Sequence, residues 1–237
     1  MADAYLLVSH GSRDPRPQIA VRQLAEQLRT CLSAVIGTAQ LELADAPLHV
    51  QISDFASQCA GSGIEKVVIL PLFLIPGVHV MDDIPVEVAL ANACGQIQSI
   101  VAPFLGSHLD FVNLFAWHGS GSTDRAIILA HGSRRSGGNQ IVEDLAAKWN
   151  VQAAYWSVTP SLTDRVTELV ATGASKIEIL PYFLFAGGIT DAIASAVAQL
   201  RSQFPQVELT LGEPIGNSPE LVTAICNLLG SIEISTN

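Results

Sequence analysis

The chain has 237 residues, of which 49% are hydrophobic and 14% are charged, and its mean hydropathy is +0.38. This composition excludes a disordered chain, because it offers ample apolar surface to offset the conformational entropy that folding removes. The formal charge of −10 argues against nucleic acid as a partner, since phosphate binding needs a basic face. An anionic small molecule stays possible, because a local group of arginines can override the overall charge.

Neither the apolar runs nor the cysteines suggest a membrane or a secreted protein. The longest apolar run, VVILPLFLIP at residues 67–76, is shorter than the roughly 20 residues that a bilayer requires. The N-terminal stretch lacks the basic segment of a secretory signal. The 4 cysteines form no CxxC pair, so we expect reduced thiols and not a cysteine-bound zinc or iron–sulfur site. We therefore expect a cytoplasmic protein with no membrane partner.

In the first half of the chain, short apolar runs alternate with segments of helical spacing. The pattern predicts strands at residues 5–8, 39–43, 67–73 and 99–103. It predicts helices at residues 17–32, 48–59 and 83–93. The run at 67–73 shows no polar–apolar alternation, which is typical of a central parallel strand covered on both faces. Strands that alternate with helices indicate a parallel sheet with right-handed crossovers.

The second half repeats the plan of the first. We predict strands at residues 126–129, 153–157, 176–183 and 207–211, and helices at residues 142–149, 162–172 and 191–204. The block YLLVSHGSR at 5–13 returns as AIILAHGSR at 126–134, and KVVILPLFLIPG at 66–77 returns as KIEILPYFLFAG at 176–187.

This repetition predicts the domain organisation. A glycine- and serine-rich segment near 116–125 has the composition of a linker between the two copies. We predict an α/β fold of two tandem duplicated domains, residues 1–118 and 124–237. Each is expected to be a small, doubly wound parallel sheet flanked by helices.

Polar side chains follow three strands of the predicted first sheet. His10 follows the first strand, Glu42 lies at the end of the second, and His79 follows the third. Ligands of open parallel sheets bind beyond the carboxyl ends of the strands. For each histidine alone, a hydrogen bond within its own loop is the plainer interpretation, but the pair favours a shared site. Two imidazoles and a carboxylate suit a divalent metal such as cobalt, iron, nickel or zinc, with coordination positions left open.

The second half offers an internal comparison. His131 repeats the first histidine, but Ile189 stands where the first half has its second histidine. Alignment on a shared proline puts Tyr155 opposite Glu42. We therefore expect one working metal site per chain, in the first half, with the second half completing the wall of the cleft.

Further charged and polar residues surround the two histidine loops. Ser12 could cap the following helix. Arg13 and Arg16 are either solvated cations of the loop or bind the carboxylates of an anionic ligand through paired hydrogen bonds. We take these three as candidate substrate-binding residues. Asp82 and Asp83 either interact with the N-terminal dipole of a helix, or support the metal ligands from behind, or form an entry path for the metal.

Three motifs carry a family resemblance: LLVSHGSRDPRP at 6–17, QLELADAP at 40–47 and VVILPLFLIPGVHVMDDIP at 67–85. They resemble the sirohydrochlorin chelatases of siroheme and cobalamin biosynthesis, and the likeness covers nearly the whole chain, in the long two-copy form of that family. It implies a lyase that inserts Co²⁺ or Fe²⁺ into sirohydrochlorin, a metal-free tetrapyrrole with many carboxylates. It maps the metal-handling histidines of the family onto His10 and His79 and its carboxylate onto Glu42.

The same resemblance implies that the metal is a substrate and that no cofactor is permanently bound. The internal duplication makes a monomer with internal pseudo-twofold symmetry reasonable. The choice among iron, cobalt and nickel stays open at this point. One rival is a non-catalytic tetrapyrrole or metal carrier, which would use the same cleft without turnover. A hydrolase or mutase with His10 as nucleophile is disfavoured, because the chain has no GxSxG elbow and no GxxxxGK[ST] loop.

Overall fold

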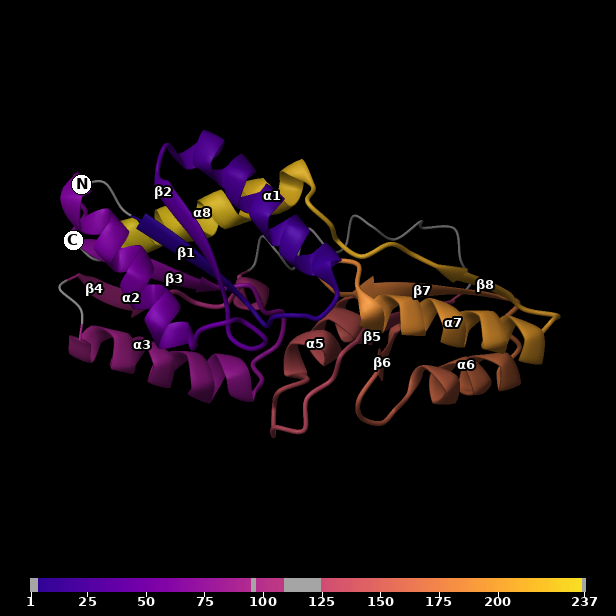
Figure 1. Cartoon of the computed structure of the whole chain (residues 1–237). Coiled ribbons are helices and arrows are strands. Elements are labelled where there is room, and N and C mark those ends of the chain that lie inside the picture. Colours follow the sequence, from indigo (N-terminus) through magenta and orange to yellow (C-terminus); the bar gives the residue numbers. More distant parts are fainter. Residues whose placement is uncertain (1–3, 95–96, 109–124, 236–237) are drawn as a thin grey trace. The chain divides into compact units, whose positions relative to one another are not determined.

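The structure, a computed structural model, describes residues 4–94, 97–108 and 125–235. The chain divides into two compact units, one of Met1–Phe111 with Asn217–Asn237 and one of Val112–Gly216. Each unit holds one four-stranded parallel sheet (Figure 1). The predicted α/β class with two repeated parallel sheets is therefore confirmed. In the part of the chain that the structure describes, no helix is both long and apolar enough to cross a membrane.

In unit 1, strands and helices alternate along the chain. Its strands are β1 (Ala4–Ser9), β2 (Val35–Gln40), β3 (Lys66–Pro71) and β4 (Gln98–Val101). Its helices are α1 (Pro15–Leu32), α2 (Leu48–Cys59), α3 (Ile84–Cys94) and α8 (Pro219–Ser235). A π turn, His79–Asp83, leads into α3, and short 3₁₀ turns lie at Ala60–Ser62 and Leu105–Ser107. The sheet order is β2-β1-β3-β4, and the strands are parallel. The loops that follow β1, β2 and β3 therefore begin side by side at the carboxyl end of the sheet.

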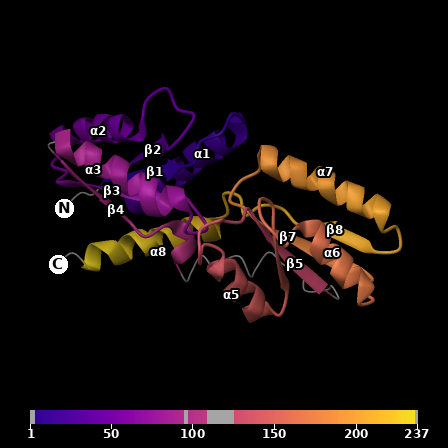
Figure 2. The same ribbon diagram turned by 90° about the horizontal axis from the view of Figure 1, so that it is seen from below.

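Helices cover both faces of the first sheet. On one face, Leu6 and Val8 of β1 join a buried cluster with Ile52 of α2 and Ile84 of α3. Side chains alternate between the faces of a strand, and Leu7 of β1 is also fully buried, on the opposite face. On that side α1 and α8 pack against each other, while Figure 1 shows α2 and α3 on the other side of the strands. In Figure 2, which is seen from below, α3 lies in front of the strands. The central strands are thus covered on both faces, as their unbroken apolar runs predict.

Helix α8 is absent from the sequence predictions. Its buried residues recur at helical spacing, at Leu221, Ile225, Leu228 and Leu229. Its packing groups it with unit 1, although the predicted second domain, residues 124–237, includes it. At its start, Asn217 Nδ2 donates a hydrogen bond of 2.8 Å to the Ala20 carbonyl of α1. The predicted linker, near residues 116–125, lies outside the described residues up to residue 124, and the domain boundaries stay a prediction.

Unit 2 repeats the topology of unit 1. Its strands are β5 (Arg125–Ala130), β6 (Gln152–Tyr155), β7 (Lys176–Tyr182) and β8 (Glu208–Leu211). Its helices are α5 (Gln140–Trp149), α6 (Leu162–Ala171) and α7 (Gly188–Gln203). The sheet order is β6-β5-β7-β8, which matches β2-β1-β3-β4 strand for strand. Apolar side chains of β5 and β7 pack with those of α6 and α7 in one buried cluster.

The second strand differs from its predicted position. It spans Val35–Gln40 and not residues 39–43. Its buried residues are Ile36 and Ala39, whereas Leu43 is 56% exposed. Burial and pairing with β1 place the strand earlier than the polar–apolar alternation of residues 39–43 suggests. Glu42 therefore lies in the loop beyond β2 and not at the strand's last residue.

Candidate metal centre

Three side chains that can bind metal meet at the carboxyl edge of the first sheet. One ligand atom each of His10, Glu42 and His79 lies within 4.8 Å of the other two. The two Nε2 atoms are 3.2 Å apart, and His10 Nε2 is 4.0 Å from Glu42 Oε2. Among the described residues, no other set of three histidine, cysteine or acidic side chains comes this close together. The structure thus brings together the three residues that the sequence selects.

A glycine turn sets the spacing of the first two residues. The Glu42 backbone N–H donates a hydrogen bond of 2.9 Å to the His10 carbonyl. Between them, Gly11 has φ +99°, and a Cβ at that position would come within 1.9 Å of the Glu42 carbonyl oxygen. Only glycine combines this conformation with so close an approach. The His-Gly turn therefore locks the His10 loop onto the Glu42 loop.

The chain turns sharply directly after Glu42. Leu43 has φ +59°, in the left-handed region, where a bulky side chain is rare. A conformation of this kind costs about 1–3 kcal/mol and persists only where surrounding contacts impose it. Backbone strain is thus stored beside the one carboxylate of the group.

His79 is the first residue of the π turn His79–Asp83, in which the Ile84 N–H bonds the His79 carbonyl. Single π turns within helices occur frequently at functional sites. On the other side of the ring, His79 Nδ1 lies 2.8 Å from Asp83 Oδ2. The plain interpretation of Asp83 as a helix-dipole residue therefore misses its main contact.

The contacts of the two Nδ1 atoms favour one tautomer for both rings. Since Asp83 can only accept when ionised, His79 carries its proton on Nδ1 and presents a lone pair on Nε2. His10 Nδ1 lies 3.2 Å from the Gly11 carbonyl, so the same tautomer follows for His10. With both protons on Nδ1, the two Nε2 atoms, 3.2 Å apart, would present lone pairs that a cation between them can bind. With metal–nitrogen bonds of about 2.1 Å, this separation corresponds to a nitrogen–metal–nitrogen angle of about 100°.

Phe73, just beyond β3, is a neighbour that sequence reasoning missed. Its ring centroid is 6.3 Å from that of His10 and 6.3 Å from that of His79. It also packs against the buried cluster of unit 1, which fixes its position. The Phe73 ring therefore forms an apolar wall beside both imidazoles. The predicted strand 67–73 ends at Phe73, as the predicted strand 176–183 ends at Phe183 in unit 2, so no sequence signal sets Phe73 apart.

Comparison with known proteins gives the family. The CbiX family model matches residues 4–117 and again residues 125–231. The chain belongs to the CbiX family. The resemblance noted from the three motifs is thereby confirmed, and both halves are CbiX repeats.

Several proteins with assigned names are similar to this CbiX chain. A sirohydrochlorin cobaltochelatase of Priestia megaterium is 26% identical over 240 residues, which cover 93% of this chain and 76% of that protein. A chloroplastic sirohydrochlorin ferrochelatase of Arabidopsis thaliana is 32% identical over 117 residues, which cover 47% of this chain and 50% of that protein. The structure of SirB from Bacillus subtilis with Fe³⁺ shares the fold, with a TM-score of 0.79 at 23% identity over 97% of this chain and 94% of SirB.

The second CbiX repeat keeps one of the three candidate ligands. The Ser157 N–H donates to the His131 carbonyl at 2.9 Å, as the Glu42 N–H does to the first histidine. Ser157 is therefore the counterpart of Glu42, and the alignment that placed Tyr155 there is wrong. The two loops differ in length before the next helix begins, so their prolines are not equivalent.

Tyr155 has no direct part in metal binding. Its hydroxyl is buried without a hydrogen-bond partner among the described residues. Burial, with the nearby Glu143 charge, raises the pKa of Tyr155 to about 12, so the phenol stays protonated. The second repeat thus has His131, Ser157 and Ile189 at the three positions, a set that lacks both a carboxylate and a second imidazole.

The candidate substrate contacts lie on the turn that follows His10. Ser12 Oγ accepts a hydrogen bond of 3.0 Å from the Asp14 N–H, which orders the turn. Arg16 Nε donates a hydrogen bond of 3.0 Å to Asp14 Oδ2, and this contact lowers the pKa of Asp14. Arg13 is exposed and makes no ion pair with any residue that the structure describes. Arg13 is thus the freer of the two cations, and all three roles stay predictions.

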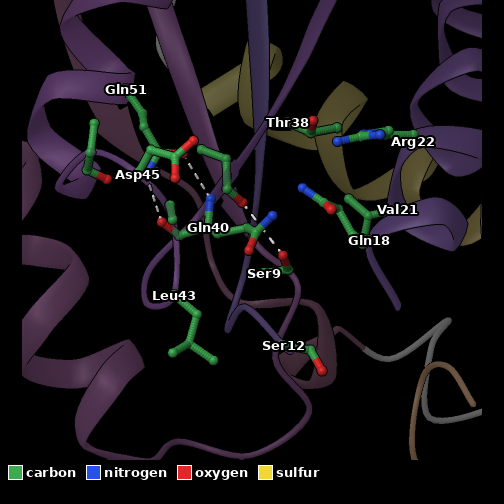
Figure 3. A pocket seen from close by; sticks show the side chains of 13 residues that line it. Ser9, Ser12, Gln18, Val21, Arg22, Thr38, Gln40, Leu43, Asp45 and Gln51 are labelled. Carbon is green, nitrogen blue, oxygen red and sulfur yellow. Dashed lines mark hydrogen bonds between the residues drawn. The ribbon is translucent and has the colours of Figure 1, made fainter. Parts of the chain in front are cut away.

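A cavity of about 500 Å³ opens beside the metal centre, between α1 and the loop after β2. Ser9 and Ser12, which flank the His10 turn, line it together with Leu43, while Arg22 and Thr38 lie at its other end (Figure 3). None of the three candidate ligands lines this cavity. The metal centre is instead an open cluster on the rim of the sheet.

Proposed function

We propose that this CbiX chain is a sirohydrochlorin chelatase, a lyase that inserts Co²⁺ or Fe²⁺ into a metal-free tetrapyrrole. The observation that carries the proposal is the pair of imidazole Nε2 atoms that face each other across 3.2 Å beside a carboxylate. The names of the Priestia and Arabidopsis relatives support the same reaction class. A non-catalytic carrier of metal or tetrapyrrole is the alternative that the assay below separates.

The two imidazoles would hold the incoming metal. A neutral imidazole with a lone pair on Nε2 is the form that binds metal. Three protein ligands or fewer leave coordination positions for pyrrole nitrogens, so the ring can replace protein ligands in turn. The side chains of His10 and Glu42 are 49% and 50% exposed, which leaves room for a flat macrocycle to approach.

Glu42 would accept protons that the macrocycle releases. Insertion of a divalent metal removes two pyrrole protons, so a base must lie beside the metal. Glu42 Oε2 is 4.0 Å from His10 Nε2, too far for a hydrogen bond, and its half-exposed side chain can turn either to the metal or to the ring. The Phe73 ring, 6.3 Å from both imidazoles, offers an apolar surface on the same side of the cluster.

The donor set does not favour one metal strongly. Imidazole and carboxylate groups suit iron, cobalt, nickel and zinc alike, so availability in the cell and the fit of the macrocycle decide the product. We propose that the chain accepts both Co²⁺ and Fe²⁺.

A turnover assay tests the proposed function. Catalytic amounts of the purified chain are mixed with sirohydrochlorin and an excess of Co²⁺, Fe²⁺ or Ni²⁺, and the absorbance of the macrocycle is followed. We expect many product molecules per chain, and loss of this activity in His10→Ala. A change that stops at one macrocycle per chain would identify a carrier, and full activity of His10→Ala would refute the assigned site.

The finer parts of the proposal concern the substrate's carboxylates and the state of the chain. Arg13 and Arg16, with Ser12, are proposed to bind the carboxylates at the rim of the macrocycle. Arg13→Ala should then raise the KM for sirohydrochlorin and leave kcat nearly unchanged. A monomer in the cytoplasm completes the proposal, and the two family matches within one chain support the monomer. Light scattering coupled to size-exclusion chromatography tests the monomer.

A further inference from the structure

The entry into the helix that carries His79 differs between the two repeats by one residue. In unit 1, the carbonyl of Gly77 accepts from the Met81 N–H, and in unit 2 the carbonyl of Gly187 accepts from the Asp191 N–H. These glycines are therefore equivalent. The first residue that joins the core cluster of its unit comes seven positions after Gly77, at Ile84, but six positions after Gly187, at Ile193.

The π turn takes up this extra residue. Unit 2 has a regular α-helix through the same stretch, Gly188–Gln203, whereas unit 1 has the π turn His79–Asp83 ahead of α3. Beyond the turn the two helices are again in step, because Ile84, Val88 and Ala91 are buried at the same spacing as Ile193, Val197 and Leu200. The core contacts of the two helices are thus alike, and the difference is confined to the turn.

The extra residue changes what lies one turn beyond the candidate ligand. In unit 2 the residue four positions after Ile189 is Ile193, which is 1% exposed and belongs to the core. In unit 1 the residue four positions after His79 is Asp83. The residue that packs into the core is Ile84, one position later. The π turn thus frees the fourth position from the core and lets its carboxylate reach His79 Nδ1 at 2.8 Å.

We propose that the extra residue of the π turn makes Asp83 the positioning residue of the metal centre. Its carboxylate holds His79 with the proton on Nδ1 and with the Nε2 lone pair toward His10. Without that acceptor, the ring is free to carry its proton on Nε2, where it would block the metal, or to rotate about its χ2 bond. The inference rests on the proposed function for the use of the site, but its tests need neither the tetrapyrrole nor turnover.

The comparison variant is Asp83→Ala, with Asp82→Ala as its matched control. Both remove one carboxylate from the same turn, and Asp83 Oδ2 is the carboxylate oxygen that lies 2.8 Å from His79 Nδ1. The loss of a hydrogen-bond partner behind a metal-binding histidine typically weakens metal affinity about 10–100-fold. We expect a loss of this size for Co²⁺ alone in Asp83→Ala, measured by calorimetric titration of the full chain, and nearly unchanged affinity in Asp82→Ala.

The tautomer supplies a readout that a merely structural role would not move. With ¹⁵N-labelled histidine, at a pH where the imidazoles are neutral, the wild-type chain should show His79 protonated on Nδ1. In Asp83→Ala the His79 signals should shift toward the Nε2-protonated form, while those of His131 stay in place. An unchanged tautomer together with unchanged Co²⁺ affinity would overturn the inference.

A deletion variant tests whether the π turn serves the site or the fold. Removal of Asp83 in an Asp82→Ala background gives the first repeat the six-residue spacing and the regular helix of the second. We expect a melting temperature close to that of the wild type and the same loss of Co²⁺ affinity as in Asp83→Ala. Unfolding of this variant would show that the turn is a requirement of the fold and would overturn the inference.

These results separate the inference from the proposed function. If the wild-type chain binds Co²⁺ but never inserts it into sirohydrochlorin, the chelatase proposal fails and the Asp83 inference stands or falls on the tautomer. If the wild-type chain turns over and Asp83→Ala matches it in affinity and tautomer, the inference alone fails.

Discussion

The two CbiX repeats share a fold but differ in the chemistry of their loops. Both have a four-stranded parallel sheet of the same strand order, and both carry a His-Gly-Ser turn after the first strand. Glycine has positive φ in both turns, +99° at Gly11 and +85° at Gly132, and in both it lies against the neighbouring loop. The turn is thus a requirement of the fold. What distinguishes the repeats is the presence of Glu42 and His79 in the first.

This difference teaches that the His-Gly-Ser motif alone does not mark the site. His131 has the same backbone setting as His10, but the equivalent loops carry Ser157 and Ile189. A single imidazole supplies too few protein ligands to hold a metal ion. A site arises only where the loops after three neighbouring strands each supply a ligand.

The largest effect on activity is expected when His79 of the first repeat is replaced by isoleucine, the residue at the equivalent position, 189, of the second repeat. His79→Ile removes one of two imidazole ligands, so we expect kcat/KM for metal insertion to fall by about 1000-fold or more. Stability should change little, because Ile189 is 40% exposed at the equivalent position of a well-formed helix. Steady-state assays with Co²⁺ and sirohydrochlorin measure the effect. The matched control His131→Ala should retain full activity, and loss of activity there would place a working site in unit 2.

The next largest effect is expected for Glu42→Ser, which copies Ser157. It removes the carboxylate but keeps a small polar side chain on a loop whose backbone contact with the His10 loop does not involve the side chain. We expect kcat to fall by about 100-fold, the usual share of one general base, while Co²⁺ affinity drops less. Equal losses in Glu42→Ser and Glu42→Asp would show that position, and not the carboxylate, is what matters.

The reverse exchange sharpens the comparison by building a site in the second repeat. Ser157→Glu combined with Ile189→His restores two imidazoles and a carboxylate around His131. We expect a second Co²⁺ per chain, bound about 10–100-fold more weakly than the first, because Ile193 occupies the place of Asp83. Calorimetric titration gives both numbers. A stoichiometry that stays at one would mean that the loops of unit 2 hold these side chains apart.

The smallest effect concerns the strained residue beside Glu42. Leu43→Gly removes a side chain that is 56% exposed from a left-handed conformation, so we expect a gain of about 0.5–1 kcal/mol in the free energy of unfolding. Val158, which follows Ser157, has no positive φ, and Val158→Gly should destabilise the chain by a similar amount. Urea denaturation measures both changes. Destabilisation by both substitutions would show that Leu43 contributes packing that outweighs its strain.

Much of the fold was predictable because buried parallel strands and amphipathic helices leave strong local patterns. The helix Leu48–Cys59 has its predicted bounds, and β1, β3 and β7 differ from theirs by one or two residues. The place of helix α8 in unit 1 could not be predicted, because the pattern of an apolar helix does not identify the sheet that it covers. Its partner α1 lies far away in sequence. The strand β2 was misplaced because pairing with β1, and not alternation, sets its start.

The candidate site was predictable to a similar degree. His10 and His79 could be brought together from the rule that strand ends of a parallel sheet share an edge. Asp83 was only one of two acidic neighbours, because a π turn leaves no mark in periodicity until the core spacing of the two repeats is compared. Phe73 could not be distinguished from an ordinary core residue, since its role depends on ring positions in space.

The central claim is that His10 and His79 hold one metal ion between their Nε2 atoms. The most direct test is a crystal of the full chain soaked in Co²⁺, with anomalous differences measured at the cobalt absorption edge. We predict a single strong peak about 2.1 Å from both Nε2 atoms, with Glu42 or water completing the shell. A peak elsewhere in the chain, or one bound by His10 alone, would contradict the account.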